Sequence, residues 1–207
     1  MDTGAATTTP AHRSASAVAL FAAVFALGLA ADLALKAWAF DALGPAPGDS
    51  PAVLAGREPR PHDSITLVPS VLALKLTLNQ GAVFGVMSGY RIFFIVATVF
   101  AVGVVAYFFC TSRASERLTH IALAMVLAGA IGNMYDRMVY FAVRDMLWLF
   151  PDVNLPFGMA WPGGARDVYP WIFNIADALL LIGIGVLAVR ALFTPQPAKS
   201  APAESKV

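Results

Sequence analysis

The chain has 207 residues, of which 58% are hydrophobic and 13% are charged, and its mean hydropathy is +0.70. Soluble domains carry about 25% charged residues, so this composition excludes an ordinary soluble globular protein and predicts a membrane protein. The net charge of +1 and the lack of a Lys/Arg cluster do not support nucleic-acid binding, and the single cysteine, Cys110, excludes an internal disulfide framework.

The first apolar segment follows a Thr- and Ala-rich tail. Residues 1–16 have the composition of a disordered segment, and residues 17–40 form an apolar run long enough to span a bilayer. This run is longer than a signal-peptide core and contains Asp32 and Lys36, so we interpret it as a retained span. The two charges are four residues apart, which allows them to face one another on a helix as a structural ion pair.

A loop and a strand outside the membrane are expected next. The prolines between residues 41 and 62 indicate an extramembrane loop. Leucine recurs at every second position in residues 72–78, which is the period of a β-strand. The Asn and Gly residues at 79–85 are typical of a turn. The edge of a small sheet would be unsatisfied in lipid, so the strand must lie at the membrane surface, over the helices.

Three more spans are expected after this strand. The second covers residues 92–110, and a short polar loop at 111–120 leads to the third at 121–135, which reaches full length only if it extends further. Residues 147–170 form an irregular excursion with prolines and a Gly-Gly pair. The fourth span runs from about residue 171 to residue 193.

Four spans place both termini on the same side of the membrane. Lys and Arg are nearly equally numerous on the two sides, but the short loop between the second and third spans is basic, which favours cytoplasmic termini. We therefore expect a four-span domain at 17–193, with extracytoplasmic segments at about 41–91 and 138–170. The flanking tails, 1–16 and 194–207, are expected to be disordered and cytoplasmic.

A group of polar side chains falls at one membrane face. Its members are Asp32, Asn79, Asn133, Asp136, Arg137, Asp145, Asn174 and Asp177. Two Asn-x-x-Asp pairs, at 133/136 and 174/177, have helical spacing, so each pair is expected to share a helix face. Contact with water ordinarily explains a polar residue at a span boundary. So many on one face favour a functional site instead.

The residue types limit the chemistry of this site. No serine or histidine accompanies these side chains, which excludes a Ser–His triad. Metal binding by several carboxylates stays open, although no His-x-x-x-His pattern or clustered Glu is present. What remains is a pair of aspartates. Two close carboxylates cannot both ionise, so they share a proton, and one can act as base and the other as acid to activate water against an amide.

Two other classes of protein were weighed. A small transporter or proton relay would favour ionisable residues at several depths through the bundle, whereas here they crowd one face. A non-catalytic assembly protein would not need two converging Asn-x-x-Asp turns.

The motifs resemble those of the bacterial lipoprotein signal peptidases (signal peptidase II), along almost the whole chain apart from the tails. The matching blocks are Asp32-Leu-Ala-Leu-Lys36, Asn79-Gln-Gly-Ala-Val-Phe84, Gly132-Asn-Met-Tyr-Asp-Arg137, Val143-Arg-Asp145 and Phe173-Asn-Ile-Ala-Asp177. Each block alone is a weak pattern, but five in the family's order on a four-span chain make a specific match.

The resemblance implies an all-α membrane protein of four transmembrane helices with a small extracytoplasmic β-sheet cradle. It implies an aspartic endopeptidase of the bacterial inner (cytoplasmic) membrane, with its active site at the extracytoplasmic face. Such an enzyme removes the signal peptide from prolipoproteins by cleaving before the diacylglyceryl-modified cysteine. No cofactor or metal is implied, and the expected partners are these prolipoproteins and membrane lipid, with the protein acting as a monomer.

By motif position, the resemblance assigns the catalytic pair to Asp145 and Asp177. The substrate-binding or supporting positions are then Asp32, Lys36, Asn79, Gly81, Asn133, Asp136, Arg137 and Asn174. Asp136 is expected to be held ionised by its local partners Arg137 and Asn133.

Two features depart from the family pattern. Arg144 and Met146 flank Asp145 where the family usually has an apolar residue and an aromatic one, and the segment between Asp145 and Asp177 is longer than usual. Neither removes a catalytic group.

Overall fold

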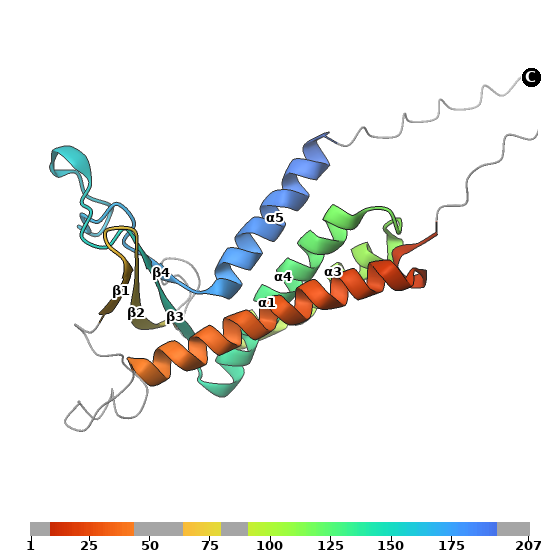
Figure 1. The fold of residues 1–207 in the computed structure, drawn as a ribbon, viewed down its shortest axis with the longest axis horizontal. Helices are drawn as coiled ribbons and strands as arrows, with labels where there is room; N and C mark the ends of the chain where they lie inside the picture. The colour runs from red at the N-terminus through yellow and green to blue at the C-terminus, as the bar shows by residue number, and fades with distance from the viewer. Residues whose placement is uncertain (1–8, 44–63, 80–90, 194–207) are drawn as a thin grey trace, which may run out of the picture.

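The computed structural model describes residues 9–43, 64–79 and 91–193. Within these residues, four helices are long and apolar enough to cross a membrane, namely α1 (Ala15–Ala42), α3 (Arg91–Thr111), α4 (Arg117–Val139) and α5 (Ile175–Phe193). Figure 1 shows them side by side, with a small sheet at one end. The predicted fold class, four membrane-spanning helices with a small sheet, is confirmed.

The chain is structured ahead of the first span, where the sequence predicted disorder. A short helix, η1 (Ala11–Arg13), precedes α1, and the buried Ala11 donates its backbone N–H to the carbonyl of Ser112 at 2.9 Å. Composition cannot reveal this order, because it comes from pairing with the loop after α3. Residues 1–8 and the 194–207 tail lie outside the described residues.

Helix α4 is the central helix of the bundle and packs against α1, α3 and α5. Small residues allow this close approach. A Cβ atom added at Gly129 would clash with the carbonyl oxygen of Ala176 on α5, and one added at Gly183 would lie 2.8 Å from the carbonyl oxygen of Ala122. The α4–α5 contact therefore depends on glycine from both helices.

The sheet contains four antiparallel strands in the order β1 (Ser64–Val68), β2 (Leu72–Asn79), β3 (Val143–Leu149) and β4 (Ile172–Phe173). Strand β2 confirms the strand predicted from alternating leucines. The register pairs Thr77 with Asp145 and Leu147 with Phe173. Figure 1 places the sheet beside the end of α1 and the start of α5.

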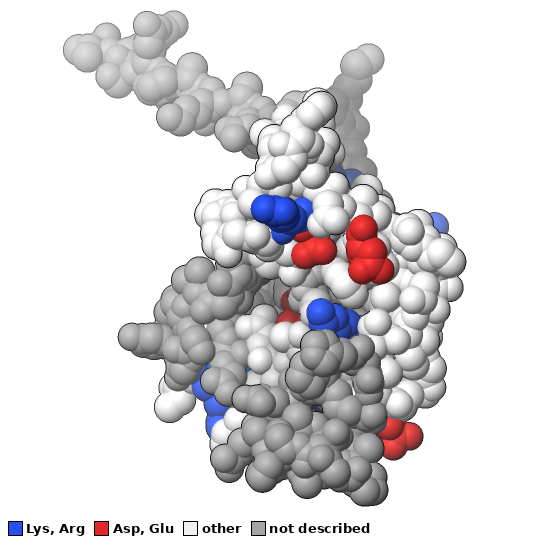
Figure 2. Space-filling model, turned by 90° about the vertical axis from the view of Figure 1, so that its left-hand side faces the viewer, with Lys and Arg blue, Asp and Glu red and all other residues white. Residues whose placement is uncertain are grey.

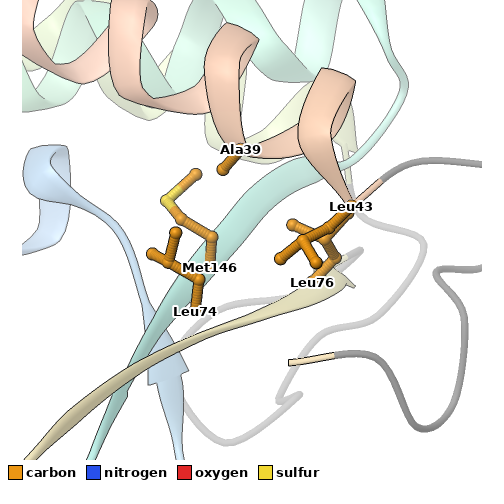
Figure 3. Close-up of a cluster of buried hydrophobic side chains, with 5 residues drawn as sticks. All are labelled: Ala39, Leu43, Leu74, Leu76 and Met146. Atoms are coloured by element: carbon orange, nitrogen blue, oxygen red, sulfur yellow. The ribbon is translucent and has the colours of Figure 1, made fainter. Parts of the chain in front are cut away.

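An apolar cluster fastens the sheet to the end of α1. Its members are Ala39, Leu43, Leu74, Leu76 and Met146. Figure 3 shows the side chains of β2 and β3 pointing toward Ala39 of α1 and Leu43, which caps that helix. Leu74 and Met146 are fully buried, and burial of a side chain of this size stabilises by about 1.5–3 kcal/mol. Met146, which departs from the family pattern, thus fills the junction between sheet and bundle.

Two boundaries differ from the sequence prediction. The excursion expected at 147–170 begins later, because β3 continues to Leu149, and it contains η3 (Pro156–Gly158) and a β-bridge between Asn154 and Asp167. The fourth helix begins at Ile175 rather than near residue 171, since the preceding residues form β4.

Candidate active site

The predicted polar side chains meet where β3 and the start of α5 reach the ends of α1 and α4. Figure 2 views the molecule from the sheet end and shows acidic atoms deep in a hollow beside a basic side chain. Gly81, one of the expected substrate-contacting positions, lies outside the described residues. The other predicted site residues are described and lie in one connected region.

Asp145 projects from β3 into a nearly water-free environment and is 1% exposed. Its Oδ1 accepts a hydrogen bond from Nδ2 of Asn174 at 2.6 Å, and its Oδ2 accepts one from Nδ2 of Asn79 at 3.2 Å. Burial, followed by the nearby charge of Asp177, raises the pKa of Asp145 to about 7. The two amide donors and Lys36 partly offset that rise. Asp145 is therefore a carboxyl group that can hold a proton near neutral pH.

Asp177 lies in the first turn of α5, where the helix dipole favours an anion. Its Oδ1 accepts from Nδ2 of Asn133 at 2.8 Å. Its backbone N–H donates to Oδ1 of Asn174 at 2.9 Å, while its Oδ2 accepts from the backbone N–H of Asn174 at 3.2 Å. This reciprocal pattern is a capping box. Asn174 therefore caps the helix from the position before its first residue, so its predicted pairing with Asp177 is made by capping and not between two residues within the helix.

The side chain of Asn174 links the two aspartates. It is fully buried, and its Nδ2 donates both to Asp145 and, at 3.1 Å, to Oδ1 of Asn133. Asn133 in turn donates to Asp177. Two amides therefore hold the carboxyl groups of β3 and α5 in one hydrogen-bonded unit.

The predicted ion pair within α1 is present and fully buried. Nζ of Lys36 lies 2.8 Å from Oδ2 of Asp32 and 3.0 Å from Oδ2 of Asp136, and it donates to Oδ1 of Asn133 at 3.1 Å. The other oxygen of Asp32 accepts from the backbone N–H of Ala176 at 2.9 Å. A charge on α1 thus satisfies an N–H group at the start of α5.

Asp136 forms its direct ion pairs with residues other than those predicted, and the predicted partner Arg137 interacts with it through its charge. Asp136 binds Lys36 and Arg144, whereas Arg137 donates to the backbone carbonyl of Asn133 at 3.3 Å and lies over the ring of Phe94 at 4.6 Å. Consecutive residues of a helix do not face the same side, which explains the difference. Arg137 still belongs to the site, because its charge interacts with Asp145 and Asp177.

The sequence reasoning missed three contributors. Ala176 contributes its backbone N–H, which donates to Asp32, and Arg144 contributes by binding Asp136. Tyr169 lies on the excursion, where its hydroxyl interacts with the charge of Asp177. The ring of Tyr169 packs edge-on against Trp171 and Phe173, and burial together with the charge of Asp177 raises its pKa. An arginine directly before a candidate catalytic aspartate was a signal in the sequence, but the other two had none.

The two other protein classes fit this arrangement poorly. In the described helices, ionisable side chains lie toward the site end or at the opposite end, where Arg190 and Glu116 approach to 3.9 Å. A relay through the membrane would favour such groups along the whole bundle.

A membrane-spanning helix bundle with two aspartates linked through asparagine side chains at one end, one of them with a pKa near 7, is the arrangement expected of a membrane-embedded aspartic hydrolase. The family model described as "Signal peptidase (SPase) II" matches residues 24–193. The chain therefore belongs to the signal peptidase II family and is a peptidase, which confirms the resemblance noted in the sequence.

Individual relatives agree with this assignment. The chain is 38% identical over 119 residues to the lipoprotein signal peptidase of Latilactobacillus sakei, covering 58% of this chain and 68% of the relative. It is 38% identical over 130 residues to that of Shouchella clausii, covering 63% and 75%. Two solved structures described as a bacterial membrane enzyme share the fold, with TM-scores of 0.62 and 0.61. They are 22% and 24% identical to this chain, covering 88% and 86% of it and 96% of each structure.

Proposed function

We propose that Asp145 and Asp177 are the catalytic pair with which this signal peptidase II releases the signal peptide of prolipoproteins, cutting before the diacylglyceryl-modified cysteine. The observation that carries the proposal is the amide bridge: Asn174 binds the carboxyl group of Asp145 through Nδ2 and that of Asp177 through its backbone N–H. If the two aspartates were polar only because they contact water at the membrane boundary, no amide bridge between them would be required.

The different environments of the two carboxyl groups give them different roles. Asp145 is buried and has a pKa of about 7, so it holds the shared proton. Asp177 is partly exposed, lies at a helix N-terminus and accepts two hydrogen bonds, so it serves as the base.

The reaction then needs only the two carboxyl groups and water. Asp177 takes a proton from water as its oxygen attacks the scissile carbonyl carbon, and Asp145 gives its proton to the carbonyl oxygen. As the C–N bond breaks, Asp177 passes its proton to the leaving nitrogen and Asp145 recovers one from the tetrahedral intermediate. The pair returns to its starting state, with one proton on Asp145.

The supporting positions fall into two groups. Asn79, Asn133 and Asn174 bind the catalytic carboxyl groups, whereas Asp32, Lys36 and Asp136 form buried ion pairs behind them. Arg137 contributes positive charge near both carboxylates. Gly81 is proposed as a substrate contact on the basis of its motif alone.

The site is proposed to face the extracytoplasmic side of the inner membrane, within a monomeric 17–193 domain flanked by cytoplasmic tails. In Figure 1 the sheet and the start of α5, which carry Asp145 and Asp177, lie at one end of the bundle, whereas α1 starts and α5 ends at the other. The acyl chains on the modified cysteine of the substrate would remain in the lipid next to the end of the bundle that holds the site. Membrane lipid is accordingly the second proposed partner.

Asparagine substitution tests the proposal. Asp145→Asn and Asp177→Asn should each lower signal-peptide release by at least about 10²-fold, and the double variant should be no worse than either single variant, because the two groups act as one unit. Release is followed on a gel that separates precursor from product, and a pull-down measures binding of the lipidated precursor, which should persist.

Asp152→Asn is the matched control. Asp152 is exposed and has a φ of 64°, a conformation that asparagine adopts readily, so this variant should cleave normally. Near wild-type cleavage by either Asp145→Asn or Asp177→Asn would refute the paired-aspartate mechanism.

A further inference from the structure

Arg144 precedes the proposed catalytic Asp145 on β3 and is itself buried, with 5% of its surface exposed. Its Nη2 and Nε donate to Oδ1 of Asp136 at 2.8 and 3.1 Å. Its backbone N–H donates to the other oxygen, Oδ2, at 3.0 Å. One carboxylate therefore binds both the side chain and the main chain of the residue immediately before Asp145.

Aromatic rings fix the guanidinium of Arg144 in this orientation. Its Cζ lies 4.0 Å from the centre of the Tyr140 ring and 5.8 Å from that of Phe40. A planar guanidinium can stack on a ring and bind a carboxylate through two N–H groups together, whereas a lysine ammonium cannot. The position is therefore specific for arginine.

The ion pairs continue from Arg144 to the other aspartate. Asp136 binds Lys36, Lys36 binds Asp32, and Asp32 accepts the backbone N–H of Ala176, the residue immediately before Asp177. The chain of alternating charges Arg144–Asp136–Lys36–Asp32, named here the charge chain, thus binds the main chain one residue ahead of each proposed catalytic aspartate.

We propose that Arg144 is a positioning residue, which holds Asp145 at its working distance from Asp177 through the charge chain. The inference rests on the proposed function of the two aspartates and assigns a role to Arg144, the residue noted above as a departure from the pattern of the family. A buried ion pair is weak evidence for stability, because apolar residues of similar volume often replace one without loss. The main-chain contacts at both ends of the charge chain instead fit a role in fixing geometry.

The first test is Arg144→Lys, which keeps the charge but loses the two-pronged contact with Asp136. We expect kcat for signal-peptide release to fall about 10-fold or more, because displacements of about 1 Å can cost up to about 10²-fold in rate. KM should stay within about twofold, since Arg144 is buried behind the site and does not contact substrate. The midpoint of thermal unfolding should change little.

The second test separates positioning from stability. Arg144→Met leaves the charge chain with an excess negative charge and should lower both kcat and the unfolding midpoint. Adding Asp136→Asn restores the charge balance, so the double variant should regain much of the unfolding midpoint while its kcat stays low. Arg166→Met is the matched control, because Arg166 is exposed on the excursion, and it should change neither quantity.

Two results would overturn the positioning role: wild-type kcat in Arg144→Lys, or recovery of kcat together with stability in the double variant. Asp145→Asn, measured in parallel, distinguishes this failure from failure of the proposed function. If Asp145→Asn is inactive and Arg144→Lys is fully active, only the positioning role of Arg144 is refuted. If Asp145→Asn is active, the assignment of Asp145 as a catalytic residue is itself refuted.

Discussion

Asp145 and Asp177 carry the same functional group in different surroundings, and under the proposed mechanism that difference makes the reaction depend on pH. The pKa of Asp145 is raised to about 7 by burial and by the charge of Asp177. Below this pH the pair keeps its shared proton, and above it Asp145 becomes ionised and cannot protonate the scissile carbonyl. The acid role is therefore lost as the pH rises.

We expect kcat at saturating substrate to fall about 10-fold per pH unit above about pH 7. The measurement is signal-peptide release in detergent between about pH 5 and about pH 9, with the unfolding midpoint recorded at each pH to show that the enzyme stays folded. A kcat that stays constant to about pH 9 would contradict the assignment of the proton to Asp145.

Lys36 is expected to stabilise the fold more than it contributes to the reaction. Its ammonium binds Asp32, Asp136 and the amide oxygen of Asn133, and all of these contacts are buried. Lys36→Met would leave two buried carboxylates without their shared cation, and breaking a buried pair in this way costs about 3–5 kcal/mol.

Lys36→Met should therefore lower yield and the unfolding midpoint more than it lowers turnover per folded molecule. Lys75→Met is the control: Lys75 lies on β2 over the ring of Trp148 and does not belong to the charge chain, so its loss should have a smaller effect. A stable but wholly inactive Lys36→Met enzyme would place Lys36 among the catalytic groups.

At the scale of elements, the contact between α4 and α5 determines where Asp177 lies. A Cβ atom at Gly129 would clash with the carbonyl oxygen of Ala176, whose N–H binds Asp32. Gly129→Ala must therefore push α5 away and strain that hydrogen bond. Overpacking of this kind costs about 1–3 kcal/mol.

We expect Gly129→Ala to lower both the unfolding midpoint and kcat. Gly185 on α5 provides the matched control, because nothing lies within 4 Å of a Cβ atom added there. Gly185→Ala should leave both quantities at their wild-type values or raise the midpoint slightly, since alanine favours helix. Equal behaviour of the two variants would show that the α4–α5 contact is not close-packed at Gly129.

The accuracy of the sequence prediction varied with the kind of element. Strand β2 was predictable because its residues alternate in character. Strand β3 gave no such pattern, since Val143 to Met146 are all buried. The start of α5 was placed too early because the apolar run passes through β4 without a break. The Asn174-x-x-Asp177 spacing did contain the capping signal.

At the scale of the whole molecule, the residues of the site could be predicted but not all of their contacts. Motif order identified the polar residues, and the bundle topology brought them to one end. The hydrogen bond from Ala176 to Asp32 joins residues 144 positions apart, and no local pattern predicts it. Adjacency suggested Arg137 as the partner of Asp136, whereas a turn after α4 brings Arg144 there instead.

The proposed orientation of the molecule in the membrane can be tested at the two ends of the bundle. The sheet, the site and the excursion occupy one end of the bundle, and the loop at 112–116 follows α3 toward the other end. The short 111–120 segment around that loop has Arg113 and Arg117 against the single Glu116, which favours the cytoplasmic side. Residues 44–63, which include most of the predicted loop after α1, lie outside the described residues, so the test uses exposed positions within the structure.

Single cysteines test this orientation in a Cys110→Ser background. Phe157 on the excursion is 98% exposed, and Ser115 is exposed on the short loop. Phe157→Cys should react with a membrane-impermeant thiol reagent on intact spheroplasts, because the reagent reaches only the outer face. Ser115→Cys should react only after lysis. The opposite pattern would place the aspartates in the cytoplasm and overturn the extracytoplasmic site. Equal labelling of Phe157→Cys and Ser115→Cys in intact spheroplasts would contradict the single span, α4, that separates the two positions.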